Sequence, residues 1–176
     1  MQHLQLNNLQ LAEEYLLQAH VICDNDPLLL NELGVAAFEK ARYNEAIHYF
    51  REALRIAELG EWDQHAWTVT WSNLGHACRK IGYSSVYVSS SFRQIVQAQI
   101  AFARAVKLNQ RDVGLSTSYA LVCMIVGDFE AAIVSLHEVL IMYPRLIYLG
   151  INHFTNRSNC ERPNDASIEF QRGYIL

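Results

Sequence analysis

The sequence has 176 residues, enough for one domain with a hydrophobic core, and only 18% of them are charged. The formal net charge is -4 and lysine and arginine are not clustered, so the composition does not indicate a nucleic-acid partner or an anionic membrane surface. Polar residues interrupt every apolar run well before the roughly 18 residues that span a bilayer, and the first residues lack a secretory signal. We therefore expect neither a membrane nor a nucleic-acid partner.

The first predicted element is a helix within residues 9–22. Its apolar side chains recur at helical spacing and return 34 residues later; they are Ala12, Leu16 and Ala19, and then Ala46, Phe50 and Ala53. Too few residues precede this helix to form a partner helix, so residues 1–26 are predicted to be a partial repeat. The apolar side of residues 9–22 would then be exposed, which would allow self-association through this end of the chain.

Residues 27–60 are predicted to form an uninterrupted helical hairpin. Asp26 and Pro27 are typical of a helix start, because aspartate caps free N–H groups and proline needs no N–H in the first turn. Small and large apolar residues follow helical spacing in both halves; they are Leu30, Leu33, Gly34, Ala37 and Phe38, and then Ala46, Ile47, Phe50, Ala53, Leu54 and Ala57. Such a hairpin cannot bury its apolar face alone, which predicts neighbouring repeats.

A longer connection follows this hairpin. The equivalent glycines Gly34 and Gly75 lie 41 residues apart rather than 34, so seven extra residues fall between about Leu59 and Ala66. Trp62 and Trp67 lie outside the repeat pattern, and we expect them to anchor this connection rather than to contact a partner.

The third predicted repeat covers residues 68–112 and contains an insert near residues 84–96. Gly75 and Ala98 lie 23 residues apart, where the equivalent interval in the preceding hairpin is 12, so 11 residues are extra. Serine and β-branched residues make this insert poor helix material. One interpretation is a lengthened loop inside the repeat, and the other is a sequence-level insertion from imperfect splicing or gene modelling.

The fourth predicted repeat covers residues 113–146. Gly127-Asp128-Phe129 marks the turn between its two helices, and Pro144 closes it. Residues 147–176 are polar, rich in asparagine and without helical periodicity, so we predict an irregular or disordered tail.

Matches at one 34-residue period carry a family resemblance. Trp71-x-x-Leu74-Gly75 is one pattern, and Ala46-x-x-x-Phe50-x-x-Ala53 is the other. Together with the closing proline, they resemble the tetratricopeptide repeat over residues 1–146. The resemblance implies an all-α fold, a tetratricopeptide-repeat superhelix that is an α–α hairpin solenoid.

The sequence contains no recognisable catalytic or metal-binding motif. No G-x-S-x-G elbow, P-loop or H-E-x-x-H is present, and the paired acids Glu13 and Glu14 fit an exposed helix face. The histidines fall in different predicted helices and would form a metal site only across repeats; they are His20, His48, His76 and His137. We therefore predict a protein that is not an enzyme and has no cofactor and no metal site.

The four cysteines are spaced too widely for a zinc knuckle or a redox pair. Cys23, Cys78 and Cys123 lie in helical apolar patterns, where we expect them to be small buried hydrophobes, and Cys160 lies in the tail. Unpaired cysteines favour a reducing, intracellular compartment.

The candidate site is the groove of the solenoid, because the first helix of each hairpin lines its inner wall and such walls commonly hold a peptide. Asparagine can hold a peptide backbone through its donor and its acceptor, and arginine can pair with a carboxylate. The alternative is that these are ordinary solvated helix positions. The predicted groove residues are Asn31, Val35, Phe38, Ser72, Asn73, His76, Arg79, Thr117, Leu121 and Met124, of which Asn31, Asn73, His76 and Arg79 favour binding most.

Local markers indicate a closer resemblance. They are His3 with Asn7-Asn8, Asp26-Pro27 leading to Asn31-Glu32-Leu33-Gly34-Val35, and Asn73-Leu74-Gly75-His76 with Cys78-Arg79-Lys80. Over about residues 1–144 they are similar to the C-terminal repeats of the Cdc16 subunit family of the anaphase-promoting complex.

This resemblance implies a scaffold subunit of a cell-cycle ubiquitin ligase that acts in mitosis, in the nucleus and cytoplasm, with other subunits as protein partners. In the family the C-terminal repeats enclose the N-terminal segment of a small partner subunit, so Asn31, Asn73, His76 and Arg79 would line that channel. The chain departs from the family in lacking the earlier repeats that carry dimerisation and in leaving the pattern after Pro144.

The alternative function is a generic tetratricopeptide adaptor or co-chaperone module that binds a partner's C-terminal tail. An acidic tail needs several lysines and arginines in the groove, and only Arg79 and Lys80 are available, so this alternative ranks lower.

Overall fold

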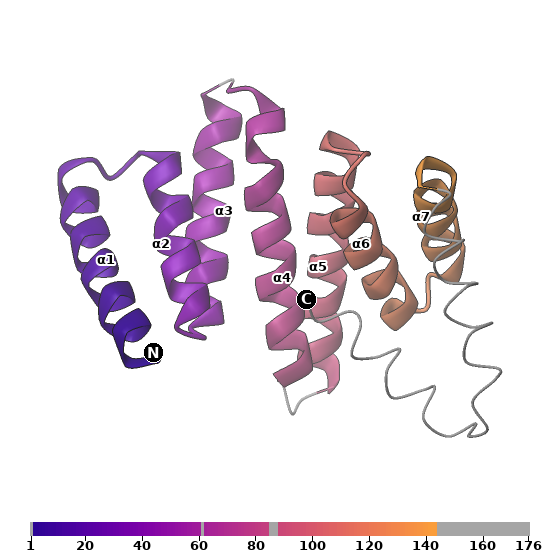
Figure 1. Cartoon of the computed structure of the whole chain (residues 1–176), viewed down its shortest axis with the longest axis horizontal. Coiled ribbons are helices and arrows are strands. Elements are labelled where there is room, and N and C mark those ends of the chain that lie inside the picture. Colours follow the sequence, from indigo (N-terminus) through magenta and orange to yellow (C-terminus); the bar gives the residue numbers. More distant parts are fainter. Residues whose placement is uncertain (1, 61, 85–87, 144–176) are drawn as a thin grey trace. The chain divides into compact units, whose positions relative to one another are not determined.

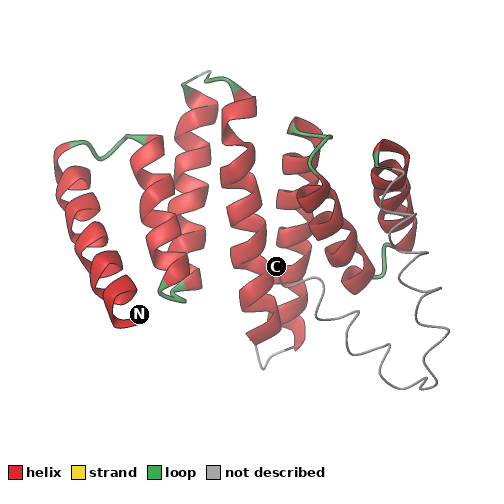
Figure 2. Ribbon diagram, in the orientation of Figure 1, coloured by secondary structure: helices red, strands yellow, loops and turns green. Residues whose placement is uncertain are grey.

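The computed structural model describes residues 2–60, 62–84 and 88–143, and the predicted tail at 147–176 lies outside them. The chain divides into two units, Met1–Val139 and Leu140–Leu176, and the packing described below is that of the first. The described residues contain helices and no strand (Figure 2). The elements are α1 (Gln2–Ile22), α2 (Pro27–Glu39), α3 (Tyr43–Leu59), the 3-10 helix η1 (Gln64–Trp67), α4 (Thr68–Ser84), α5 (Val88–Leu108), α6 (Val113–Val126) and α7 (Phe129–Met142).

Successive helices pack on one another in chain order. Each helix from α1 to α5 contacts the next one along the chain, and the contacts are most extensive within the hairpins α2–α3 and α4–α5 (Figure 1). The last hairpin is packed less closely, through a cluster of Ala120, Cys123 and Ala132 and a hydrogen bond of 3.1 Å from the Ser135 hydroxyl to the Ser116 carbonyl. Stacked α–α hairpins are the architecture that the sequence repeat predicted.

The helix starts follow the predicted capping chemistry. The Asp26 carboxylate accepts hydrogen bonds from the backbone N–H groups of Leu28, at 2.9 Å, and Leu29, at 3.4 Å, and Pro27 begins α2. At the end of α6, Gly127 is the C-cap residue and has a φ of +90°, a left-handed conformation that glycine adopts without strain. Both predicted boundaries are confirmed.

Two phenylalanine–glycine contacts bring the helices of a hairpin close together. Phe50 of α3 is fully buried against Gly34 of α2, and Phe102 of α5 is fully buried against Gly75 of α4. A Cβ added at Gly34 would lie 2.5 Å from the Phe50 ring, and one added at Gly75 would lie 2.9 Å from the Phe102 ring. A small residue is therefore required wherever the ring of the second helix crosses the first.

The predicted loop at residues 84–96 is wrong for the residues that the structure describes. Helix α4 continues to Ser84 and helix α5 already begins at Val88, so the extra residues lengthen both helices. Ile95 of the insert is buried and lies against Gly82, and the Ser91 hydroxyl donates a hydrogen bond to the Gly82 carbonyl. Tertiary contacts thus override the low helix propensity of the segment. Residues 85–87 lie outside the described part, and the splicing interpretation stays a hypothesis.

The connection before α4 is anchored by a tryptophan, as predicted. Trp67 ends the short helix η1 and is buried in the main core, whereas Trp62 is half exposed and meets the Trp67 ring edge-on, with ring centroids 6.1 Å apart. The Thr68 hydroxyl donates a hydrogen bond of 2.8 Å to the His65 carbonyl and closes the turn. The described residues of this connection, 62–67, therefore form an ordered corner.

Helix α1 packs against α2. Glu13 of α1 forms ion pairs with Lys40 and Arg42, which follow α2. Large apolar side chains on α1, such as Tyr15 and Val21, are exposed. Self-association through this face stays a prediction.

Two of the three cysteines that were expected to be buried are buried, and one is exposed. Cys78 and Cys123 are fully buried, and burial raises the pKa of the Cys78 thiol to about 11. Cys23 is exposed, so its predicted burial is wrong: it follows the last residue of α1, where no neighbouring helix covers it. Cys160 lies outside the described residues.

Candidate protein-binding surface

The predicted groove residues lie on α2, α4 and α6, the first helices of the three described hairpins. Helix α2 contacts α4 directly, and α4 and the start of α6 line a common cavity. Eight of the ten predicted side chains are half-buried, and the exposed pair is Leu121 and Met124. Some of these side chains already have partners within the fold, and others are free to bind another molecule.

Asn31 already has partners within the fold. Its side-chain carbonyl accepts a hydrogen bond of 2.9 Å from the Thr70 hydroxyl on α4, and its amide nitrogen donates one of 3.1 Å to the Glu32 carboxylate. The side chain therefore joins α2 to α4. A bound peptide would have to compete with Thr70 for the Asn31 carbonyl.

Val35 and Phe38, the other two predicted residues on α2, pack against the main core. Phe38 also meets the Tyr43 ring edge-on, with ring centroids 5.3 Å apart. Such an aromatic contact stabilises the turn between α2 and α3. Both residues therefore have a packing role that the sequence did not separate from a binding role.

His76 of α4 is held neutral by its surroundings. Burial lowers the pKa of His76 to about 4, and the charges of Arg79 and Lys80 lower it in the same direction. The imidazole stands edge-on to the Phe102 ring, with centroids 4.9 Å apart, and its Nδ1 lies 3.4 Å from an Nη atom of Arg79. A neutral imidazole can accept a hydrogen bond from the guanidinium and does not repel it.

Arg79 has unused hydrogen-bonding capacity. Its guanidinium lies over the Tyr83 ring, 5.8 Å from the centroid, and its Nε is buried without a hydrogen-bond partner. Within the described residues, no carboxylate lies within ion-pair distance of it. A half-buried guanidinium that lacks a carboxylate can bind one from another molecule with little competition.

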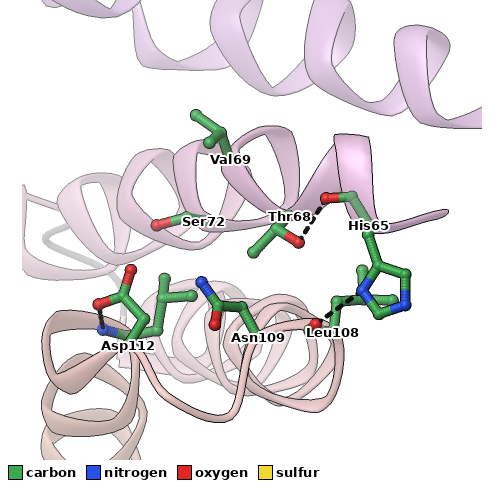
Figure 3. A pocket seen from close by; sticks show the side chains of 8 residues that line it. His65, Thr68, Val69, Ser72, Leu108, Asn109 and Asp112 are labelled. Carbon is green, nitrogen blue, oxygen red and sulfur yellow. Dashed lines mark hydrogen bonds between the residues drawn. The ribbon is translucent and has the colours of Figure 1, made fainter. Parts of the chain in front are cut away.

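Ser72, another predicted residue, lines a cavity, which we call the Ser72 cavity. It has a volume of about 430 Å³ and lies among η1, the first turns of α4, the end of α5 and the start of α6 (Figure 3). Asn73, next to Ser72 on α4, is half-buried and does not line it. The lining residues are His65, Thr68, Val69, Ser72, Leu108, Asn109, Asp112 and Leu115.

The predicted residues on α6 are mainly apolar in character. The Thr117 hydroxyl donates within its own helix, to the carbonyls of Val113 at 2.8 Å and Gly114 at 3.0 Å, so its proton is not free to bond to a partner. Leu121 and Met124 are exposed. This helix therefore offers apolar contact, whereas α4 offers a cation and hydrogen-bonding groups.

The sequence prediction missed most of the Ser72 cavity. Val69 could have been found, because it precedes Ser72 by three residues and so lies on the same face of a helix. Asp112 precedes the fourth repeat as Asp26 precedes the second, which marks it as a helix cap but not as a cavity wall. His65 lies in the single turn of η1 and Asn109 in the connection between α5 and α6, and both segments are too short for a periodic pattern to report position.

The described residues contain no group of three or more histidine, cysteine, aspartate or glutamate side chains that could hold a metal ion. Nor does any helix among them have the length and apolarity needed to cross a membrane. The arrangement of side chains is thus one of hydrogen-bonding and apolar contact groups on the first helices.

Comparison with known families identifies the repeat. The family model described as Tetratricopeptide repeat matches residues 27–59, which are the α2–α3 hairpin. A crystal structure of a thermophilic tetratricopeptide-repeat protein from Thermus thermophilus aligns with a TM-score of 0.59 and 16% identity, over 99% of this chain and 95% of that one. At this identity the likeness concerns the fold alone.

Sequence relatives are subunits of one complex. The chain is 37% identical to the anaphase-promoting complex subunit cut9 of Schizosaccharomyces pombe over 147 residues, which are 84% of this chain and 20% of cut9. It is 29% identical to the subunit CDC16 of Saccharomyces cerevisiae over 144 residues, which are 82% of this chain and 16% of that protein. The chain thus spans about a fifth of the length of these relatives.

A solved structure agrees with the sequence relatives. In the crystal structure of the APC/C hetero-tetramer Cut9-Hcn1, the matching chain has a TM-score of 0.64 and 38% identity, over 82% of this chain and 26% of that one. The predicted fold class and the predicted resemblance are therefore confirmed. The chain is a tetratricopeptide-repeat protein with an all-α solenoid fold, and over most of its length it resembles the Cut9/CDC16 subunits of the anaphase-promoting complex.

Proposed function

We propose that this chain is a non-catalytic scaffold subunit of the anaphase-promoting complex, acting in the nucleus and cytoplasm, and that it binds a segment of a partner subunit along its first helices. The observation that carries the proposal is the 37% identity to cut9 over 84% of the chain. The related Cut9 chain crystallised in a hetero-tetramer with Hcn1, so an Hcn1-type subunit is the partner that we propose.

The side chains of α4 and α6 support binding of a polypeptide segment. Arg79 supplies a guanidinium whose Nε lacks a partner, and the neutral His76 beside it leaves the positive charge undiminished. Leu121 and Met124 supply exposed apolar surface on the next first helix. A carboxylate at Arg79 and apolar side chains on α6 would together fix the register of a bound segment.

A co-chaperone module for acidic C-terminal tails is less well supported. Such a module needs several cations converging on the tail carboxylates. Lys80 is exposed beside Arg79, whereas the groove positions predicted on α2 and α6 carry no lysine or arginine. We therefore keep this function as the alternative.

Affinity purification of the tagged chain from dividing cells tests the assembly proposal. Mass spectrometry should recover other subunits of the anaphase-promoting complex together with the chain. Recovery of chaperones in place of those subunits would favour the alternative, and the absence of every subunit of the complex would reject the proposal.

Direct binding tests the role of Arg79. Fluorescence anisotropy with labelled peptides that tile the Hcn1 sequence should identify a tile that binds. The Arg79→Ala variant should raise its Kd about tenfold or more, because a charge-assisted hydrogen bond contributes about 1.5–3 kcal/mol. Arg55→Ala is the matched control, since Arg55 lies on α3 and pairs there with Glu52. An unchanged Kd in Arg79→Ala would remove Arg79 from the proposed surface.

A further inference from the structure

The Ser72 cavity has two walls that differ in origin. Thr68, Val69 and Ser72 come from the first turns of α4, while Asn109 and Asp112 come from the connection between α5 and α6. Figure 3 shows the side chains of Asn109 and Asp112 reaching from their wall toward Thr68 and Ser72 on the other. A ligand in the cavity would therefore contact α4 and the connection that leads to α6 at once.

Three polar side chains of the cavity have unused hydrogen-bonding capacity within the described residues. The Ser72 hydroxyl and the Asn109 amide form no hydrogen bond there, and only one oxygen of the Asp112 carboxylate is used, accepting from the Leu115 N–H at 3.1 Å. The Thr68 hydroxyl, by contrast, donates to the His65 carbonyl, and the His65 Nδ1 lies 2.9 Å from the Leu108 carbonyl oxygen. The free groups named here therefore come from α4 and from the connection between α5 and α6.

The electrostatics of the cavity favour a cation. Asp112 is its one carboxylate, and no lysine or arginine is among its lining residues. The start of α6 would otherwise attract an anion, but the Asp112 carboxylate already caps it. The opposite end of α5 also lies here, because Leu108 is its last residue, and the C-terminal end of a helix favours positive charge.

We propose that the Ser72 cavity receives the basic side chain, a lysine or an arginine, of the protein segment that the first helices bind. The aliphatic part of this side chain lies against Val69 and Leu115, and its charged end bonds to Asp112 with Asn109 and Ser72 beside it. The inference rests on the proposed function and adds to it the chemistry of the partner: a basic residue at this cavity, in addition to an acidic group at Arg79.

Small probes test the cavity without a partner protein. Nuclear magnetic resonance of the 15N-labelled chain is recorded with n-butylammonium, n-butylguanidinium, 1-butanol and butyrate. The two cations should shift the amide signals of Ser72, Asn109 and Asp112 and bind about twofold to fivefold more tightly than 1-butanol, a range typical of a partly exposed charge pair. Equal binding of butanol and the cations, or tighter binding of butyrate, would overturn the inference.

Asp112→Asn is the informative variant, since asparagine also caps helices and α6 should stay folded. It should remove the preference for cations. Asp26→Asn is the matched control, because Asp26 caps α2 in the same way and lines none of the cavities described above. An equal loss of cation binding in both variants would indicate a non-specific effect of charge and would contradict the proposal.

Binding of peptides tests whether the cavity takes part in the proposed partner binding. In the Hcn1 tile that binds, replacing the basic residue by norleucine should weaken binding about twofold to fivefold, and Asp112→Asn should add little further loss. A tile that binds and depends on Arg79, but in which no basic residue couples to Asp112, would overturn this inference and leave the proposed function intact. If no tile binds while the cations still do, the Hcn1-type partner fails and the preference of the cavity stands.

Discussion

Gly34 and Gly75 show how single positions set the distance between paired helices. Each lies under the ring of a buried phenylalanine, Phe50 or Phe102, from the second helix of its own hairpin. The sequence already indicated close approach there, because a glycine inside a helix lowers helix propensity and needs a packing reason. The structure supplies the packing reason, because a Cβ at Gly34 or Gly75 would lie within 3 Å of the phenylalanine ring.

We predict that Gly34→Ala destabilises the protein by about 1–3 kcal/mol, because the new methyl group would lie 2.5 Å from the Phe50 ring and force it to move. Urea denaturation followed by circular dichroism measures the change in the free energy of unfolding. Gly114→Ala is the matched control: the nearest atom to its added Cβ is an Asp112 carboxylate oxygen at 3.2 Å, and we expect neutral or slightly higher stability. Equal losses in the two variants would refute the packing argument.

Glu13 makes a pH-dependent contribution at the α1–α2 boundary. Its hydrogen bond with Lys40, helped by Arg42, lowers the pKa of the carboxyl below its ordinary value of 4.5. A lowered pKa in the folded state means that the stabilisation is complete above pH 4.5 and is lost as the pH falls through the folded-state pKa. The ion pairs with Lys40 and Arg42 therefore help to hold α1 at neutral pH, and their contribution is lost in acid.

Glu13→Gln should lower the free energy of unfolding by up to about 1 kcal/mol at pH 7, since the paired groups are partly exposed. Thermal denaturation from pH 7 down to pH 3 should show the variant and the wild type converging below pH 4.5. Glu14→Gln, at the exposed neighbouring position, should match the wild type throughout. A difference between Glu13→Gln and wild type that persists in acid would contradict the assignment.

For the candidate surface, the sequence predicted the helix on which each residue lies but not the contacts of its side chain. The sequence placed Asn31, His76 and Arg79 on first helices, which is correct, because helical periodicity reports which face a residue occupies. It did not reveal that Asn31 is already bonded to Thr70, or that His76 is buried enough to stay neutral. The first fact depends on a side chain of the next repeat, and the second on the packing around α4 within its own hairpin.

At the scale of elements, helix α5 is longer than its sequence predicted. Its first turns contain Ser89, Ser90 and Ser91, which are weak helix formers, yet the helix begins at Val88. Burial of Ile95 against Gly82 of the lengthened α4 offsets that weakness. The insert therefore extends an existing hairpin.

Ile95→Ala should destabilise the protein by about 2–5 kcal/mol, because it leaves a cavity over Gly82. Hydrogen exchange of the amides in the first turns of α5 should also accelerate more than exchange in its later turns. Phe92→Ala, whose ring is 55% exposed on the same helix, should change stability by no more than about 0.5 kcal/mol. Unchanged exchange in the Ile95 variant would mean that other contacts hold this segment.

At the scale of the whole molecule, the α2–α3 hairpin has neighbours on both sides. Helix α2 contacts α1 and α4, and helix α3 contacts α4 as well as α2. In a repeat protein, stability is approximately a sum of repeat terms and interface terms, so an internal repeat supports more interfaces than a terminal helix does.

Ala53→Pro, in the middle of α3 where the side chain is fully buried, should cost about 3 kcal/mol or more and unfold neighbouring helices with α3. Circular dichroism should show a loss of helical signal larger than the residues of α3 account for. Gln18→Pro, exposed on α1, should remove no more helix than α1 contains. Equal losses of helical signal in the two variants would mean that the repeats do not support one another.

The sequence by itself determined the fold class, the 34-residue repeat, the helix caps and the helix faces, because helical periodicity and capping are local properties of the chain. Only the tertiary structure decided that residues 88–96 are helical, that Asn31 and Phe38 are already engaged, and that Asp112 faces Ser72 across a cavity. These outcomes depend on the free energy of contacts between residues far apart in sequence, which no local pattern contains. The chemistry of the candidate surface is therefore a property of adjacent repeats acting together.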